Sequence, residues 1–390
     1  MLAARGSLIA FALCFGCALP GCALIDGLSG NEGPDSSPFG RATTFSSSLA
    51  DPRKVAVGEF DGVPPDDVLV VDGSSRYEVW TGASPGGGFA IQGPMGPMFG
   101  PPQEIGMGDF NASGTAEVFI RTGDVVHIDS LGLITDCTFL GATTMLIDDI
   151  DGDGLVDIAV GANQPVSITI AYGTSDPNLG CGEPFLLDLG TVPRQLVAFD
   201  HDIDGDMDLG VLLDGSAGIQ IMNNLADEAR FRELVFAGIA EWTRGDPGEV
   251  ATKLVVGDFD DDGRRDLAVS VASSRGDRIR IGRGIGNGEF DFAGGVDIAQ
   301  GVVAGDMVSF GSSISDADNS LAAAHVPGNE EGVHLAIGLG NLEFDEGTVD
   351  DGFDGQPFAL GAADLDFDGI DDLFGPVNPT RRIAFLFSSE

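Results

Sequence analysis

The sequence predicts an all-β fold, a seven-bladed β-propeller, and three observations support that prediction. One short pattern recurs along the chain: an apolar run, an Asp-rich loop and a second apolar run. Successive copies lie roughly 40 to 60 residues apart, a period that suits a four-stranded propeller blade. The 59 glycines and 20 prolines are typical of short strands joined by tight turns, and runs with helical periodicity are almost absent.

Four copies of the pattern are clear and carry the full set of acids. They lie at residues 146–160, 197–211, 255–269 and 362–374. Two weaker copies precede them, at residues 57–70 and 107–120. A seventh, worn copy starts at Val303 and aligns its acid at Asp306, so that its loop has lost the other acids. Asp316 and Asp318 further on are interpreted as solvated loop residues.

The two ends of the chain fit the closure of a ring. The last unit is one strand short, because the chain stops after the expected strand at residues 382–388. A strand at residues 42–49 would complete that sheet and remove two open edges. We therefore expect a signal peptide at residues 1–21, an anchor and linker at 22–40, and one propeller over 41–390.

The acids of the clear copies follow the pattern D-x-D-x-D-G-x-x-D, which we interpret as a calcium loop. Alternating carboxylates on a tight loop can point at one centre, the glycine permits the turn, and the next residue offers its backbone carbonyl. Calcium takes about six to eight oxygen ligands, so we expect about four Ca²⁺ ions in the molecule. The predicted ligands are Asp149, Asp151, Asp153, Leu155, Asp157; Asp200, Asp202, Asp204, Asp206, Asp208; Asp258, Asp260, Asp262, Arg264, Asp266; and Asp364, Asp366, Asp368, Ile370, Asp372.

An EF-hand is the alternative interpretation of such a loop, and the flanking sequences exclude it. An EF-hand needs a Glu at the twelfth loop position and a helix on each side. The twelfth position here is Val160, Val211, Val269 or Gly375, and the flanking runs are apolar and β-branched. The loops resemble instead those of the FG-GAP/VCBS repeat family, of the integrin-α N-terminal type. This resemblance covers roughly residues 42–390 and implies loops whose calcium stiffens the propeller blades, in a protein of adhesion or assembly.

The two weaker copies depart from the family pattern. The first has Glu59, Asp61 and Asp67, but Val63 and Pro64 replace a ligand and the turn glycine, so we expect no ion there. The second is built on residues 109–117 and has Asn and Ser in place of two acids and Glu in place of the last. We expect this second loop to hold calcium weakly or not at all.

The charge of the chain excludes several classes of partner. With 62 acidic and 19 basic residues the formal net charge is −43, which disfavours nucleic acid and anionic membrane surfaces. Bound divalent cations would offset this self-repulsion. Residues 244–283 differ from the rest because they hold eight basic residues. This stretch is either a docking face for an acidic partner or glycan, or a set of local pairs with neighbouring acids.

The N-terminus predicts export. Arg5 precedes an apolar run at residues 8–19 that is too short for a membrane span. The following Leu19-Pro20-Gly21-Cys22 resembles a bacterial lipoprotein signal, which implies cleavage after Gly21 and a lipid on Cys22. The chain would then be an outer-membrane lipoprotein facing the periplasm or cell surface, and otherwise a secreted protein. Membrane contact is expected only through that lipid.

Two further cysteines, Cys137 and Cys181, belong to the expected propeller. An oxidising compartment would allow them to pair and so link the second and third blades. The sequence leaves open whether they do.

The expected function is that of a binding or scaffold module and not of an enzyme. No known catalytic motif occurs in a fitting context, and the paired carboxylates have the spacing of calcium loops. The partner is a protein or a glycan, and the scarcity of Trp (two residues) and Tyr (two residues) favours a protein. The alternatives are a non-catalytic accessory subunit of a secreted hydrolase and, less favoured, a carbohydrate-active enzyme.

Overall fold

The computed structural model describes most of the chain from residue 39 onward, and every regular element in that part is a β-strand. None of these described residues forms a helix that is long and apolar enough to cross a membrane. The expected signal peptide and Cys22 lie outside them. The described residues are 39, 42–63, 66–82, 88–97, 99–175, 180–181, 184–205, 207–215, 218–224, 234–235, 249–274, 276–286, 289–302, 304–311, 319–325, 332–349, 359–377 and 380–388.

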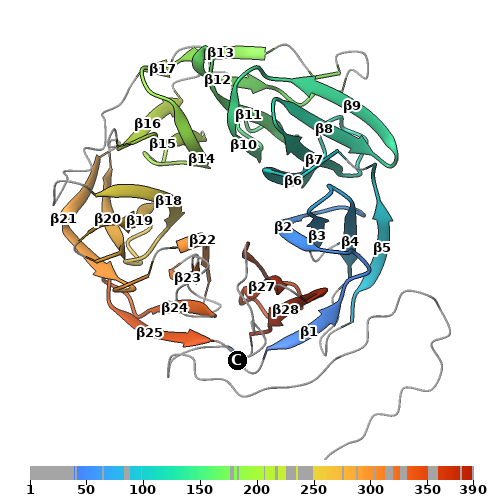
Figure 1. Ribbon diagram of the computed structural model, residues 1–390. Coiled ribbons are helices and arrows are strands. Elements are labelled where there is room, and N and C mark those ends of the chain that lie inside the picture. The colour runs from blue at the N-terminus through green and yellow to red at the C-terminus, as the bar shows by residue number, and fades with distance from the viewer. Residues whose placement is uncertain are drawn as a thin grey trace, which may run out of the picture.

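The strands form seven four-stranded antiparallel sheets in a ring (Figure 1), which confirms the predicted seven-bladed β-propeller. Each sheet is one blade. Blades 1 to 4 are β2 (Pro52–Gly58), β3 (Asp67–Asp72), β4 (Tyr77–Thr81), β5 (Ala90–Met95); β6 (Glu104–Gly108), β7 (Glu117–Thr122), β8 (Val125–Ser130), β9 (Leu133–Thr138); β10 (Ala142–Asp148), β11 (Asp157–Asn163), β12 (Val166–Ala171), β13 (Pro184–Asp188); and β14 (Pro193–Phe199), β15 (Asp208–Leu213), β16 (Ile219–Asn224), β17 (Leu234–Val235).

The remaining blades complete the ring. Blades 5 to 7 are β18 (Val250–Gly257), β19 (Asp266–Ala272), β20 (Arg278–Gly286), β21 (Glu289–Ile298); β22 (Ala304–Phe310), β23 (Ser320–His325), β24 (Val333–Gly338), β25 (Phe344–Val349); and β26 (Gly361–Ala363), β27 (Asp372–Val377), β28 (Arg382–Leu386), β1 (Thr43–Ser46). The first strand of each blade lies at the centre and contacts the first strands of both neighbouring blades, so the ring is closed.

The last blade combines both ends of the described chain. Strand β1 pairs antiparallel with β28, with Thr43 opposite Phe385 and Ser46 opposite Arg382. It is the outer strand of the blade and lies within residues 42–49, where the sequence predicts a strand that completes the last sheet. Because the N-terminal strand completes a sheet made by the C-terminal strands, unfolding of either end opens the ring.

The core lies between neighbouring blades. The second strands β3, β15 and β27 are buried at every residue, since each is covered on both faces by adjacent sheets. The contact between blades 7 and 1 is typical, with Phe45, Trp80 and Phe385 each fully buried in one cluster. The near-continuous apolar runs that follow the acidic loops in the sequence therefore correspond to the buried second strands of the blades.

The strand order gives the ring two distinct faces. Strands alternate in direction within a blade, so the connections from first to second strand and from third to fourth emerge on the same face. The connections from second to third strand, and from one blade to the next, emerge on the other. All the Asp-rich loops belong to the first kind, and we call the face that they form the acidic face.

The sixth blade corrects one detail of the sequence alignment. Asp306 lies within strand β22, opposite Ala324, and not in a loop. The equivalent connection instead runs from Gly311 to Asn319, where most residues, including Asp316 and Asp318, lie outside the described part. The misalignment arose because Gly-Asp at residues 305–306 matches the Gly-Asp of the blade-5 loop, although the inner strand continues for four more residues.

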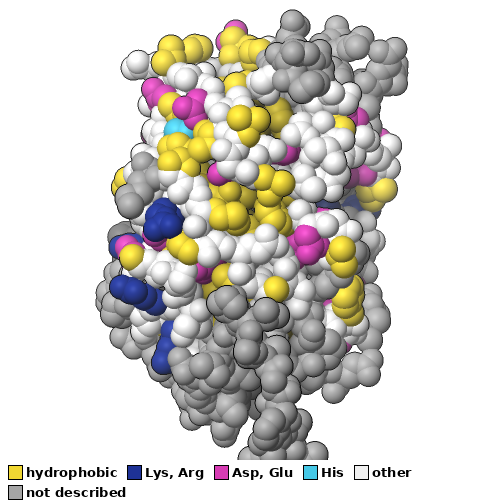
Figure 2. Space-filling model, turned by 90° about the vertical axis from the view of Figure 1, so that its right-hand side faces the viewer, with side chains coloured by type: hydrophobic (Ala, Val, Ile, Leu, Met, Phe, Trp, Pro, Cys, Tyr) yellow, Lys and Arg dark blue, Asp and Glu magenta, His cyan; other side chains and the backbone are white. Residues whose placement is uncertain are grey.

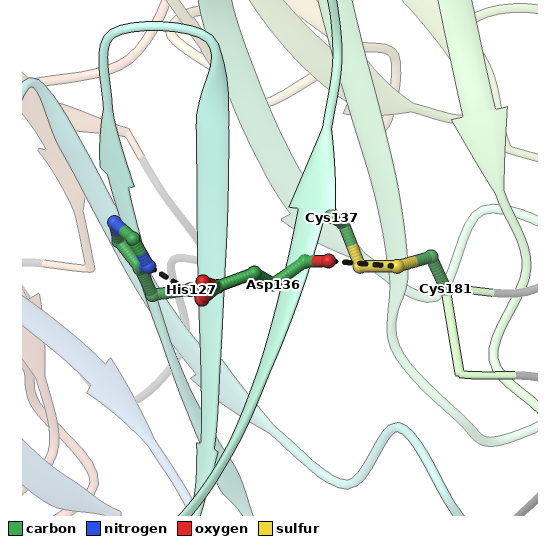
Figure 3. The surroundings of a disulfide bond; sticks show 4 residues. All are labelled: His127, Asp136, Cys137 and Cys181. Atoms are coloured by element: carbon green, nitrogen blue, oxygen red, sulfur yellow. Dashed lines mark hydrogen bonds and ion pairs between the residues drawn. A yellow bond between two sulfur atoms is a disulfide. The ribbon is translucent and has the colours of Figure 1, made fainter.

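A disulfide joins Cys137 on β9 of blade 2 to Cys181, which precedes β13 of blade 3. Figure 3 shows it beside His127 and Asp136, whose side chains face each other on β8 and β9. The His127 Nδ1 lies 2.7 Å from Asp136 Oδ1. The question that the sequence left open is thereby answered, and the two blades are covalently linked.

Candidate metal sites in the strand-connecting loops

In the described part of the chain, six blades have an acidic loop between their first and second strands, and the first and last acids are equally spaced in all six. We number each loop from its first acid, so that Asp149 is position 1 and Asp157 is position 9. Position 1 is the residue that directly follows the inner strand. The acid at position 9 is always the first residue of the second strand, at Asp67, Glu117, Asp157, Asp208, Asp266 and Asp372.

Carboxylates organise the backbone of each loop. In blade 3, Asp149 accepts hydrogen bonds from the backbone N–H groups of Asp153 (3.1 Å) and Gly154 (2.9 Å). Asp157 accepts from the N–H groups of Ile150 (3.0 Å) and, across the sheet, Gly173 (2.7 Å). Position 1 therefore fixes the tip of the loop, and position 9 fixes its base to the third strand.

The same two sets of bonds recur in the other predicted loops. Asp258 accepts from Gly263 N (2.9 Å) in blade 5, and Asp364 accepts from Gly369 N (3.0 Å) in blade 7. Gly263 has a φ of +81°, a left-handed conformation in which a residue with a side chain is strained. The turn glycine of the sequence pattern is thus required by the backbone.

At least three of the four predicted loops bring carboxylates together closely enough to share one cation. One oxygen from each of three acids lies within 4.8 Å of the others in these loops. The groups are Asp149, Asp151 and Asp157; Asp200, Asp202 and Asp204; and Asp258, Asp260 and Asp262. In blade 7, Asp364 and Asp368 lie near enough to Asp366 to raise its pKa, although burial is the larger cause.

Burial of the position-9 carboxyls perturbs their ionisation. Asp157, Asp266 and Asp372 are fully buried, and burial raises the pKa of each to about 7. Burial is the largest cause of these raised pKa values; the neighbouring carboxylate at position 3 contributes in the same direction, and hydrogen bonds from backbone N–H groups act against it. Such a group is costly to ionise unless a cation lies beside it.

Several buried carboxylate oxygens have no hydrogen-bond partner among the described residues. Those in the acidic loops include the Oδ1 atoms of Asp202 and Asp364, in blades 4 and 7, and of Asp67 in blade 1. A buried, unpaired carboxylate oxygen is unfavourable without a proton or a cation. The donor set is almost wholly oxygen, which fits a hard cation such as Ca²⁺ better than zinc.

The residues predicted to bind calcium through their backbone carbonyl groups are at position 7, two residues after the acid at position 5. The N–H groups of Leu155, Arg264 and Ile370 each donate to the Asp two residues earlier, at 2.9 Å. The carbonyl oxygen of Ile370 accepts from the hydroxyl of Ser388 (3.2 Å). Asp206 lies outside the described residues.

Three contacts within these loops were not anticipated from the sequence. His201, expected to be a packing residue, is buried and its Nδ1 is hydrogen-bonded to Asp208 Oδ2. Burial lowers the pKa of His201, but the hydrogen bond and the charge of Asp208 outweigh it, so the pKa lies above its usual value. Asn223 donates to Asp202 Oδ2 (3.1 Å), and Arg283 forms an ion pair with Asp260.

The two loops that depart from the pattern differ from each other in structure. In blade 1, Glu59, Asp61 and Asp67 come as close together as the acids of the predicted loops. In blade 2, both oxygens of Glu117 already have partners, because one accepts from Phe110 N and the other from Asn111 Nδ2 and Ser130 Oγ. The hydrogen bonds of the Glu117 carboxylate are therefore made within blade 2, whereas in blade 1 the Oδ1 atom of Asp67 has no hydrogen-bond partner among the described residues.

The basic stretch at residues 244–283 consists largely of ion pairs. Five of its eight basic side chains contact acids: Lys253 with Asp306, Arg264 with Asp262, Arg278 with Glu249 and Asp297, Arg280 with Asp297, and Arg283 with Asp260. Arg244 and Arg275 lie outside the described residues. Local pairing is thus the correct interpretation for these five.

Comparisons with known proteins support the fold. No protein-family model matches the sequence, and no curated protein does. Two solved structures of BBS1N in complex with ARL6DN are similar, one soaked with mercury and one with lead. The first is 11% identical, covers 91% of this chain and 98% of that chain, and has a TM-score of 0.63. The second is 11% identical, covers 94% and 97%, and has a TM-score of 0.59. At this identity the likeness shows the propeller fold alone.

Proposed function

We propose that this β-propeller binds calcium in its acidic loops and acts as a binding or scaffold module. The observation that carries the proposal is the close grouping of loop carboxylates in blades 3, 4 and 5, together with the buried, unpaired carboxylate oxygens in the loops of blades 4 and 7. When bound, Ca²⁺ would neutralise charge and cross-link each loop. The residues that would hold it are the four acids of each predicted loop, with the carbonyl oxygen at position 7.

A structural role for calcium is supported by the contacts of the loop acids, and a binding role for the molecule by other observations. In the predicted loops, the first and last acids fix the backbone, which is the behaviour of a structural site. The similar propeller BBS1N was solved in complex with ARL6DN, a protein partner. Trp80 and Tyr77, whose rings would stack on sugars if exposed, are buried. These observations favour a protein partner over a glycan, and a non-catalytic role.

We also propose that the chain is exported and anchored through a lipid on Cys22. The disulfide between Cys137 and Cys181 supports export, because disulfides persist mainly in oxidising compartments. Replacing Cys22 with Ser should move the protein from the detergent phase to the aqueous phase. Unchanged partitioning of the variant would contradict the anchor.

Calcium binding is tested by counting ions and measuring stability together. Native mass spectrometry should find about four ions, and each saturated site should raise the apparent unfolding free energy by roughly 3–4 kcal/mol over the chelated protein. Asp151→Asn and Asp260→Asn should each remove one ion. Asp188→Asn, on the exposed outer strand β13, removes the same charge and should leave the count unchanged. No bound calcium and equal melting temperatures would overturn the proposal.

A further inference from the structure

Exposed hydrophobic side chains gather on the acidic face. Nine large hydrophobic residues are markedly exposed in the described part of the chain, and seven of them lie in or beside a connection on that face. The other two are Leu140, between blades 2 and 3, and Leu186, on the outer strand β13. The seven are Val63, Leu131, Leu133, Ile203, Ile285, Leu339 and Phe367, with exposed fractions of 46–74%.

Turn formation does not account for three of these side chains. Leu131, Ile203 and Phe367 have positive φ values of 51°, 63° and 66°. Glycine, Asn or Asp adopts this conformation with less strain, and a β-branched residue such as Ile203 rarely does. Glycine or a small polar residue at these three positions would therefore relieve backbone strain. The large apolar side chains found there indicate a function other than turn formation.

The loops that carry the seven exposed side chains, which we call the apolar tips, belong to a face on which hydrogen bonds join loops of neighbouring blades. Asn341 N, in the blade 6 loop that carries Leu339, donates to the carbonyl of Asp260 in the blade 5 acidic loop (3.2 Å). Similar bonds join the loops of blades 2 and 3, from Val156 N to Asp109 O (2.9 Å), and of blades 6 and 7, from Asp371 N to Gly311 O (3.2 Å). Neighbouring loops are therefore held in place relative to one another.

Figure 2 shows the side on which β5 and β9 lie, where hydrophobic side chains are spread across the middle and basic side chains lie toward one edge. Leu133, at the start of β9, is 74% exposed and belongs to the hairpin tip on the acidic face. The apolar tips and the acidic loops thus share one face of the molecule.

The charge of the acidic face selects among possible occupants. A loop with four carboxylates keeps a net charge of −2 with one Ca²⁺ bound, so the face stays negative in the calcium-loaded protein. A second copy of the face, or an anionic membrane, would be repelled. A surface with Lys or Arg among apolar side chains would complement both the charge and the tips.

We propose that the acidic face docks a protein whose contact surface is basic and carries apolar side chains. This inference rests on the binding role proposed above, and it assigns that role to one face. The loop tips supply the apolar contacts, and the carboxylates that calcium leaves uncompensated supply the charge. The opposite face, which carries the turns between second and third strands, stays outside the contact.

Two synthetic peptides test the proposal on the full calcium-loaded chain. One alternates Lys and Leu, and the other has Ser in place of every Leu at equal length and charge. The chain should bind the Leu peptide at least about tenfold more tightly than the Ser peptide. The variant Leu133→Ser, Ile285→Ser, Leu339→Ser removes three tips outside the acidic loops and should reduce this preference to less than about threefold.

The control variant Leu140→Ser, Leu186→Ser removes two hydrophobic residues away from the acidic face and should keep the full preference. An equal affinity for the two peptides, or a preference that survives in the tip variant, would overturn the proposal. So would tip-dependent binding to phosphatidylcholine vesicles without any peptide preference, which would assign the face to a lipid surface. The calcium count of each variant separates a failure of docking from a failure of calcium binding.

Discussion

At position 2 of the acidic loops, a single residue distinguishes the blade 4 site from the equivalent sites in the other blades. This position holds a buried apolar side chain in five blades: Phe60, Phe110, Ile150, Phe259 and Leu365. In blade 4 it is His201, whose ring lies as deep but is hydrogen-bonded to the position-9 carboxylate of Asp208. That carboxylate therefore has an imidazole partner that the equivalent groups of the other loops lack, and a metal ion has to compete with it.

Replacing His201 with Phe should tighten calcium binding in blade 4. Phe occupies the same position in blades 1, 2 and 5, so the loop can accept its volume. Without the imidazole, Asp208 Oδ2 keeps only the hydrogen bond from the backbone N–H of residue 201 (3.0 Å), and we expect a severalfold lower dissociation constant for one of the sites. Isothermal titration calorimetry with native mass spectrometry would measure it.

His334→Phe is the matched control, because His334 lies on β24 and its Nε2 is 3.0 Å from Glu346 Oε2, outside the acidic loops. It should leave all calcium affinities unchanged. Weaker calcium binding by the His201 variant would show that the imidazole supports the site instead of competing for it.

At the scale of elements, the closure of the ring depends on more than the pairing of β1 with β28. The turn that follows β1 is fixed to blade 1 through Glu78 on β4, a fully buried carboxylate. It accepts hydrogen bonds from Ser47 Oγ (2.8 Å), Ser48 N (3.0 Å) and Trp80 Nε1 (3.1 Å). The carboxylate thus joins the strand that completes blade 7 to the next blade.

Glu78→Gln should destabilise the whole propeller. The new amide group would present N–H donors to partners that are themselves donors, and leaving one buried donor unsatisfied costs about 1–3 kcal/mol. We expect a lower unfolding free energy, measured by circular dichroism in chemical denaturant. Glu289→Gln, on the exposed start of β21, removes the same charge and should have little effect. Equal stability of the two variants would mean that Glu78 does not tie the ring together.

The fold could be predicted because its strongest signals are local. The acids, the turn glycine and the flanking strands of one loop lie within about fifteen residues. The repeat units of blades 3, 4, 5 and 7 can therefore be recognised from the sequence. Blade 6 was misaligned because its loop lacks that motif. Partners from other strands, such as Arg283 beside Asp260 or Glu78 beside Ser47, were missed because nothing in the local sequence specifies which residues the fold brings together.

At the scale of the molecule, charge and proton binding are linked. The chain has a formal net charge of −43, and it places carboxyl groups in the interior of several blades. Burial raises the pKa of Asp157, Asp266 and Asp372 to about 7, and that of Asp67 to about 6. Without calcium, the folded protein therefore holds protons that the unfolded chain releases near pH 4.

The stability of the calcium-free protein should fall as the pH rises from about 4 to about 7. Across this window the folded state binds more protons than the unfolded state, so linkage gives a negative slope of unfolding free energy with pH. Self-repulsion of the acidic chain acts in the same direction. Calcium binds the ionised carboxylates, and its stabilising effect should therefore grow with pH.

Melting temperatures at about pH 5, 6, 7 and 8, with chelator and with calcium, measure both trends. The difference between the two conditions should widen steadily, since protons compete with calcium at low pH and cease to do so above the raised pKa values. Asp157→Asn removes one of the shifted carboxyls and one ligand, so it should flatten the chelator series and narrow the difference at high pH. A chelated protein whose melting temperature rises over this range would show that the position-9 carboxyls are ionised in the folded state without a metal ion.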